Sequence, residues 1–141
     1  MTVNQISVFI ENKYGKLSEI LALLGKENIH IIAATVADTS EYGILRLIVA
    51  ESEKAYRILK DNNVSANITD VIAISTESAA GSFANALKCF TQSGISIEYM
   101  YCFSLKEKSV LILRTSNRDA AREVIRRNNL DYLSESDLLN L

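Results

Sequence analysis

The sequence contains no proline and no tryptophan, and its 141 residues include one histidine and two cysteines. It has no Cys-x-x-Cys pair, no His-x-x-x-His pair and no glycine-rich phosphate loop, so it predicts neither a zinc site nor a nucleotide-binding loop. Cys89 and Cys102 have no neighbouring base to activate a thiolate, and we expect both to be small core residues. The shortage of catalytic residue types favours a protein that is not an enzyme and needs no cofactor.

Long runs of one residue class are also missing. No apolar stretch approaches the roughly 20 residues that span a bilayer, and the first residues lack the basic region of a signal peptide. We therefore expect a cytoplasmic protein that does not contact membranes. The 15 basic and 17 acidic residues give a net charge of -2 without a long run of either sign. This balance argues against nucleic acid as a partner, because proteins that neutralise phosphates usually have a basic face.

What the chain does contain is an internal repeat. An offset of 66 positions aligns 12 identical residue pairs, among them Gly15 with Gly81 and Asn62-Asn63 with Asn128-Asn129. Average residue usage predicts roughly four or five such identities by chance. The chain is therefore predicted to be two copies of one unit, with domains at 1–69 and 70–141.

Each copy has the same order of predicted elements. Hydrophobic periodicity predicts strands at 5–11, 29–37, 43–50 and 64–70 in the first copy, with helices at 15–27 and from Ser52, a predicted N-cap, to Asn62-Asn63. The second copy has predicted strands at 71–76, 95–105, 109–116 and 130–135 and helices at 81–93 and 118–129. Strand-helix-strand-strand-helix-strand is the ferredoxin-like order. We predict an α+β chain of two such domains, each an antiparallel sheet with helices on one face.

The predicted third strand has apolar residues on both faces. Alternation along a strand places Ile44 and Ile48 opposite Leu45 and Leu47. Both faces of the sheet are therefore expected to be covered, by the partner repeat, by another chain or by both. Since uncovered sheet faces need partners, we expect a homodimer.

The segment from Ile10 to Leu17, followed by a helix and by residues 27–31, resembles the ACT domain. This is the small-molecule-sensing module of aspartate kinase, phosphoglycerate dehydrogenase and prephenate dehydratase. Residues 76–83 and 93–97 hold the same places in the second copy, so the resemblance covers the whole chain as two ACT domains. It is similar to stand-alone tandem ACT proteins, which have no catalytic domain. The resemblance implies a regulatory sensor that binds a free amino acid or similar small molecule and shifts domain or partner association, with a metabolic enzyme as a possible partner.

In this family the ligand generally lies where two ACT domains meet, against the turn between the first strand and the first helix. The physics is consistent, because Gly15 lets a ligand approach the backbone and the amides that open a helix favour a carboxylate. The ligand-binding candidates that the resemblance implies are Asn12, Lys13, Tyr14, Gly15, Lys16, Leu17, His30 and Ile31 in the first copy, and Ser78, Ala80, Gly81, Ser82, Phe83, Ser96, Ile97, Glu98 and Tyr99 in the second.

Two departures from the family pattern keep alternatives open. Tyr14 and Ala80 stand where the family usually has a proline, and the second loop lacks the asparagine found at position 12. The candidates also have structural interpretations: the glycines permit a tight turn, Asn12 caps its own loop, His30 is an ordinary half-buried residue and Tyr99 packs at an interface. The alternative function is a non-catalytic structural or adaptor subunit with decayed ligand sites. A small enzyme or RNA binder is disfavoured, since a general base, metal ligands and base-stacking strand aromatics are missing.

Overall fold

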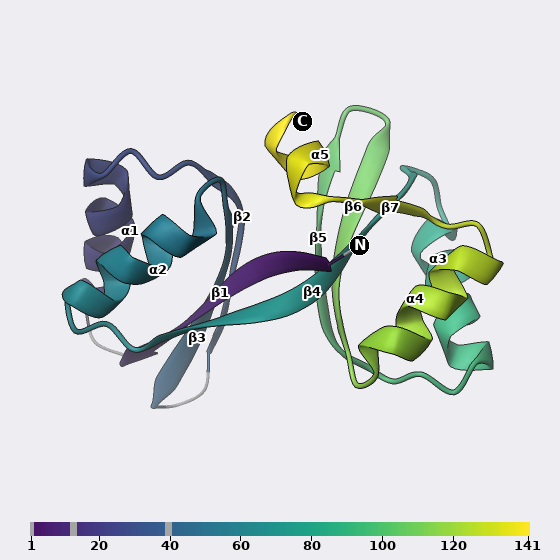
Figure 1. The fold of residues 1–141 in the computed structure, drawn as a ribbon, viewed down its shortest axis with the longest axis horizontal. Helices are drawn as coiled ribbons and strands as arrows, with labels where there is room; N and C mark the ends of the chain where they lie inside the picture. Colours follow the sequence, from purple (N-terminus) through teal and green to yellow (C-terminus); the bar gives the residue numbers. More distant parts are fainter. Residues whose placement is uncertain (1, 12–13, 39–40) are drawn as a thin grey trace. The chain divides into compact units, whose positions relative to one another are not determined.

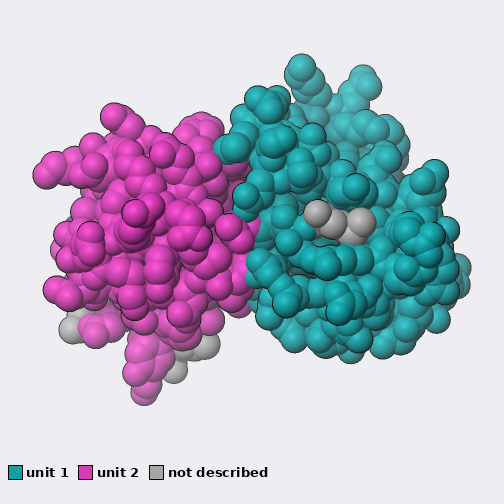
Figure 2. All heavy atoms as spheres, in the orientation of Figure 1, with its two compact units in different colours: residues 1–3, 70–141 teal, residues 4–69 magenta. Residues whose placement is uncertain are grey.

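The computed structural model describes residues 2–11, 14–38 and 41–141. The chain divides into two compact units (Figure 2). Unit 2 comprises Asn4–Thr69, and unit 1 comprises Asp70–Leu141 together with the start of the chain up to Val3. Both units combine an antiparallel sheet with helices, so the predicted α+β class is confirmed.

Unit 2 is built on the strand order β2-β3-β1-β4. Its elements are β1 (Thr2–Glu11), α1 (Lys16–Lys26), β2 (Ile31–Asp38), β3 (Tyr42–Val49), α2 (Ser52–Asp61) and the first part of β4 (Ala66–Glu77). Alternate residues of β1 and β3 pack with Leu24 of α1 and Leu59 of α2 in one buried core. Both helices therefore cover the same face of the sheet (Figure 1).

Unit 1 repeats this order as β7-β4-β6-β5. Its elements are the rest of β4, α3 (Ser82–Gln92), β5 (Ile97–Leu105), β6 (Lys108–Thr115), α4 (Arg118–Arg127) and β7 (Asp131–Leu133). Ile74 of β4 and Leu111 of β6 share a core with Phe90 of α3 and Val124 of α4. The predicted ferredoxin-like order is thus confirmed in both copies.

The four long helices end in the same way. Each is followed by a residue with left-handed backbone: Asn28, Asn63, Gly94 and Asn129. After α1 the amide of Ile29 donates to the carbonyl of Leu24 at 3.0 Å, and equivalent bonds close α2, α3 and α4. This is the Schellman pattern, in which the apolar residue after the turn packs back on the helix. The predicted role of Asn62-Asn63 at the end of a helix is confirmed.

Three local features differ from the predicted elements. β4 is one continuous strand where two strands, 64–70 and 71–76, were predicted, and a short helix α5 (Glu135–Leu139) was not predicted. The prediction that Ser52 caps α2 is wrong, because the N-cap is Glu51. Ser52 Oγ instead accepts a hydrogen bond from Asn4 Nδ2 at 3.3 Å.

A β-bulge alters the faces of β2. The register of β2 against β3 shifts between Ile31 and Ala33, and β5 shifts against β6 at the matching place. Ile31 therefore shares a face with Ala34 and Val36, whereas strict alternation grouped it with Ala33 and Thr35. The bulge recurs at the same offset in both units, so it is part of the repeated fold.

Unit 1 has an additional cover on its sheet. Leu133 of β7 pairs with Ala73, on the face away from α3 and α4, and α5 lies on that side (Figure 1). Leu138 of α5 is buried. The expectation that Cys102 is a core residue is wrong, because it is exposed on the end strand β5, while Cys89 is half-buried. None of the helices in the described ranges is long and apolar enough to cross a membrane.

Candidate functional site

The two loops that precede α1 and α3 have the same backbone geometry. Gly15 and Gly81 are the N-caps, with φ angles of 84° and 85°. In the described part of the chain, neither helix has a side chain that accepts a hydrogen bond from its first amides. The first internal bonds run from Glu19 N to Gly15 O and from Asn85 N to Gly81 O, both at 2.9 Å. The amides of the first turn therefore form a positive end that can accept an anionic group.

A pocket of about 500 Å³ lies at the second of these loops. Its walls are the loop, the start of α3 and the ends of β5 and β6, with small or uncharged side chains throughout: Ser78, Ala79, Ala80, Gly81, Phe83, Ala84, Ser104 and Ser109. The side chain of Ser109 is 3% exposed. The predicted candidates Ser78, Ala80, Gly81 and Phe83 thus meet in one pocket, beside the half-buried Ser82.

The base of this loop is fixed by contacts with the β5–β6 turn. Ser78 N donates to the carbonyl of Glu107 at 2.9 Å. Lys108 Nζ lies 2.6 Å from Glu77 Oε1, and this hydrogen bond raises the pKa of the Lys108 ammonium. The pair links the end of β4 to the start of β6, where Glu77 and Lys108 are also partners in the strand register.

The first loop has a different chemical environment. Lys16 forms an ion pair with Glu19 at 3.5 Å, and Asp38 occupies the position that Ser104 has in unit 1. Tyr14 and Leu17 are exposed, while the candidates Asn12 and Lys13 lie outside the described residues. The first turn of α1 therefore carries the charged residues Lys16 and Glu19, where the matching positions of α3 are the uncharged Ser82 and Asn85.

The remaining candidates lie at the other end of each sheet. Gly43 pairs with both Ile10 and Asp38, so the C-terminal end of β2 lies beside the loop that follows β1. His30 precedes the first residue of β2, at the opposite end of that strand. Seven strand steps separate Ile31 from Asp38, a distance of roughly 23 Å. His30 is exposed and Ile31 half-buried. Within unit 2 alone, neither is brought to the Gly15 loop.

The second copy shows the same separation. At the end of β6 nearest the Gly81 loop, Lys108 pairs with Glu77 of β4. At the opposite end of β6, Thr115 pairs with Ile97 of β5. Ser96, Ile97, Glu98 and Tyr99 therefore lie away from the Gly81 loop within unit 1. Glu98 Oε2 lies 3.6 Å from Arg114 Nε, and Tyr99 is half-buried. Their role as ligand-binding residues stays a prediction.

The sequence analysis did not find Ala79, Ala84, Ser104 and Ser109. Ser104 and Ser109 pair with each other across the β5–β6 turn, which the β4–β6 pairing brings beside the Gly81 loop. The signal that was available is this turn, three residues long between the predicted strands 95–105 and 109–116. Across 2–11, 14–38 and 41–141, no group of three or more His, Cys, Asp or Glu side chains is placed to hold a metal ion.

Comparison with known proteins identifies the family. A family model described as "ACT domain pair" matches residues 1–141. The chain belongs to this family. ACT domain pairs are typical of amino-acid-binding regulatory domains, and the resemblance and the fold predicted from the sequence are both confirmed. No relative was found among curated proteins.

Solved structures with this fold include two informative ones. Protein BT0572 from Bacteroides thetaiotaomicron is 42% identical to this chain and superposes with a TM-score of 0.95. The match covers 100% of this chain and 98% of the BT0572 chain. The ligand-free regulatory subunit of aspartate kinase from Thermus thermophilus is 14% identical, covers 88% of this chain and 91% of its own, and has a TM-score of 0.64. At that identity the second likeness shows the fold alone.

Proposed function

We propose that this ACT domain pair, with domains at 1–69 and 70–141, is a non-catalytic sensor of a free amino acid. Binding shifts the association of the protein with a second copy or with a metabolic enzyme. The observation that carries the proposal is the pocket at the Gly81 loop, where the uncapped start of α3 meets small, uncharged side chains. A carboxylate placed there would accept hydrogen bonds from the first-turn amides.

The second loop is the better carboxylate site of the two. The first turn of α3 has no acidic residue, whereas the first turn of α1 has Glu19. In the repeat alignment, Asp38 of the first copy also matches the uncharged Ser104 of the pocket. Negative side chains near a helix start compete with an anionic ligand for the same positive end. The buried Ser109 and the exposed Ser104 offer hydroxyl groups that can accept or donate hydrogen bonds to the polar groups of the ligand. An ammonium group would bind carbonyl oxygens of the same loop.

The proposal is tested by thermal denaturation of the purified protein with each of the twenty amino acids. A ligand at a hundredfold excess over its Kd stabilises the native state by about 2.7 kcal/mol, which raises Tm by several degrees in a chain of this size. We expect such a rise for one or a few amino acids. No rise with any of them, for a protein shown to be folded, would contradict the proposal and favour an adaptor subunit.

The variant Ala84→Glu assigns the response to the second loop. Its carboxylate lies in the first turn of α3, where it suits the helix dipole but repels a ligand carboxylate, so we expect affinity to fall roughly tenfold or more without loss of Tm. Ser18→Glu is the matched control at the equivalent position of α1 and should retain binding. Isothermal titration of both variants measures the difference. Loss in the control instead would move the site to the first loop.

A further inference from the structure

Three hydroxyl side chains form a row across the sheet of unit 1, at the end beside the loop that precedes α3. In the strand register Thr76 of β4 is opposite Ser109 of β6, and Ser109 is opposite Ser104 of β5. Directly opposite residues point to the same face of a sheet, with Cβ atoms about 5 Å apart. The next pair on this face, Ile74 and Leu111, belongs to the core that includes α3 and α4. The three hydroxyls therefore lie on the helix side of the sheet, where Ser104 and Ser109 line the pocket at that loop.

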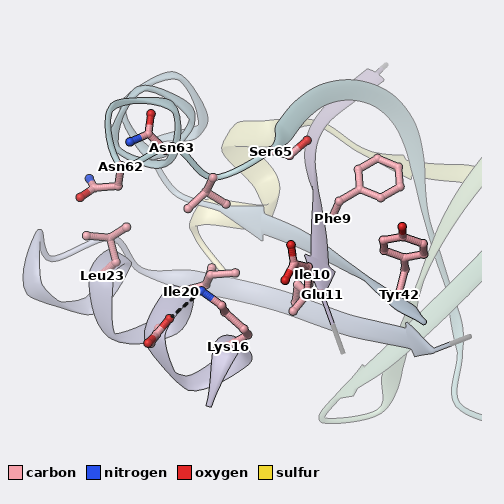
Figure 3. Close-up of a pocket in the computed structure, with 12 residues that line it drawn as sticks. Phe9, Ile10, Glu11, Lys16, Ile20, Leu23, Tyr42, Asn62, Asn63 and Ser65 are labelled. Atoms are coloured by element: carbon pink, nitrogen blue, oxygen red, sulfur yellow. Dashed lines mark ion pairs between the residues drawn. The ribbon is translucent and has the colours of Figure 1, made fainter. Parts of the chain in front are cut away.

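The first copy has different chemical groups at this end of its sheet. In the repeat alignment, Ile10 takes the place of Thr76. Ile10 lines a pocket of about 520 Å³ in unit 2, which also contains Lys16 and Glu19, an ion pair at 3.5 Å (Figure 3). The hydroxyl row is therefore specific to the second copy, although both copies share the backbone that carries it.

Two hydroxyls of the row are enclosed by the protein. Ser109 is 3% exposed and lines the pocket, so its remaining accessible surface opens there. Thr76 Oγ1 is buried and has no hydrogen-bond partner in the described part of the chain. A buried hydroxyl without a hydrogen bond lowers stability, and such groups usually have a partner. Because a hydroxyl has one hydrogen and two lone pairs, Ser109 can bond to Thr76 on one side and to a ligand on the other.

We propose that the amino acid bound at the Gly81 loop has a neutral side chain that carries a hydroxyl or an amide. That side chain hydrogen-bonds to Ser109 and Ser104, and Thr76 is a positioning residue that holds the Ser109 hydroxyl. This inference rests on the proposed function, because it takes the ligand carboxylate to lie at the start of α3.

The pocket lining disfavours the other classes of amino acid. Among the described residues that line the pocket, none carries a charge. A second carboxylate on the ligand would meet no cation there, and an ammonium or guanidinium side chain would meet no carboxylate. An apolar side chain would cover the Ser109 hydroxyl without giving it a partner. Since about 500 Å³ is room enough for any of these side chains, hydrogen bonding rather than size decides between them.

Isothermal titration with pairs of free amino acids of similar shape tests the proposal. The pairs are serine and alanine, threonine and valine, tyrosine and phenylalanine, asparagine and aspartate, and glutamine and glutamate. We expect saturable binding of the first member of at least one pair, with at least tenfold weaker binding of the second. Tightest binding of a charged or apolar amino acid would overturn this inference and leave the proposed function standing. No binding of any amino acid would contradict both.

The variant Ser109→Ala locates the contact. It removes one hydroxyl and should lower the affinity ratio of the bound amino acid to its pair partner roughly fivefold or more. Ser75→Ala makes the same change at a half-buried residue on the opposite face of β4 and should leave the ratio unchanged. A general loss of stability would weaken both amino acids together and would not change their ratio. An unchanged ratio in Ser109→Ala would overturn the proposal.

A second pair of variants tests the positioning role of Thr76. Thr115 Oγ1 is also buried without a hydrogen-bond partner in the described residues, but Thr115 lies at the far end of β6. Valine has nearly the shape of threonine without its hydroxyl. We expect the affinity ratio to fall several-fold in Thr76→Val and to stay unchanged in Thr115→Val. Equal ratios in the two variants, both shown to be folded by circular dichroism, would overturn the proposal.

Discussion

Gly15 and Gly81 adopt the same left-handed backbone, although the loops around them differ in almost every side chain. A Cβ added at either position would meet no atom within 4 Å. Space is therefore not what requires glycine there, and the requirement comes from the backbone angle itself. These two residues set the direction in which each following helix presents its amides.

Substitution at Gly15 should therefore cost only backbone strain. We expect Gly15→Ala to lower the free energy of unfolding by about 1–2 kcal/mol, because an L-residue is disfavoured at this φ. Gly25→Ala adds the same methyl group within α1, also with no atom within 4 Å, and should raise it by about 0.5–1 kcal/mol. Urea denaturation measures both. The same sign of change for the two variants would contradict this explanation.

Single residues also mark the limit of what the sequence predicted. Gly81 and Ser78 were identified from the repeat and the family pattern, and the structure places both in one pocket. Ser109 was missed because no spacing rule links it to a loop about 30 residues earlier, and strand pairing alone brings it there. Cys102 looked like a core residue in an apolar strand, but the end strand of a sheet is less covered than the strands within it.

At the scale of elements, α5 is held by a reciprocal capping box. Ser134 N donates to Asp137 Oδ2 at 2.8 Å, and Asp137 N donates to Ser134 Oγ at 3.1 Å. The bond from the Ser134 amide is the main cause that lowers the pKa of the Asp137 carboxyl below its ordinary value. Because the folded pKa is the lower one, the bonds stabilise α5 above the ordinary aspartate pKa and are lost as the pH falls through the folded value.

We therefore expect α5 to loosen in acid, from about pH 4 downward. Hydrogen exchange of the Leu138 amide should be slow at pH 6 and, once corrected for the intrinsic pH dependence of exchange, much less protected at pH 3. In Asp137→Asn the carboxylate is absent at every pH, so the protection of α5 should be lower and independent of pH over this range. Equal protection of the unaltered protein at both values would contradict the role of Asp137.

Most elements were predictable, because the repeat showed every strand and helix twice and each copy supported the other. α5 has no counterpart in the first copy, and five residues are too few for periodicity to detect. Its Ser-x-x-Asp spacing from Ser134 was the available signal. The break predicted within β4 was wrong, because alternation does not reveal that a strand continues from one unit into the next. The bulge after Ile31 likewise leaves no mark on residue type.

At the scale of the whole molecule, the two units do not divide at a single point in the chain. Val3 groups with unit 1 and Val8 with the core of unit 2, although both belong to β1. Val3 is 1% exposed, so its side chain is fully buried. The first strand is therefore shared between units that the repeat alignment separates at residue 69.

This sharing means that two matched variants in the same strand should destabilise different units. Val3→Ala should lower the stability of unit 1 and Val8→Ala that of unit 2, each by about 1.5–3 kcal/mol for a buried valine. Native-state hydrogen exchange resolves the two, with amides of β6 reporting on unit 1 and amides of β3 on unit 2. Equal loss of protection in both strands for either variant would show that the units open together.

The duplicated fold also has a genetic consequence. In an assembly of identical single-domain chains, every substitution appears in all copies at once. Equivalent loops in such an assembly therefore cannot differ in sequence. Two copies within one reading frame are free of that constraint, and each loop accumulates changes alone. The uncharged pocket lining at Gly81 and the charged first turn of α1, with Lys16 and Glu19, are the kind of difference that two independently changing copies allow.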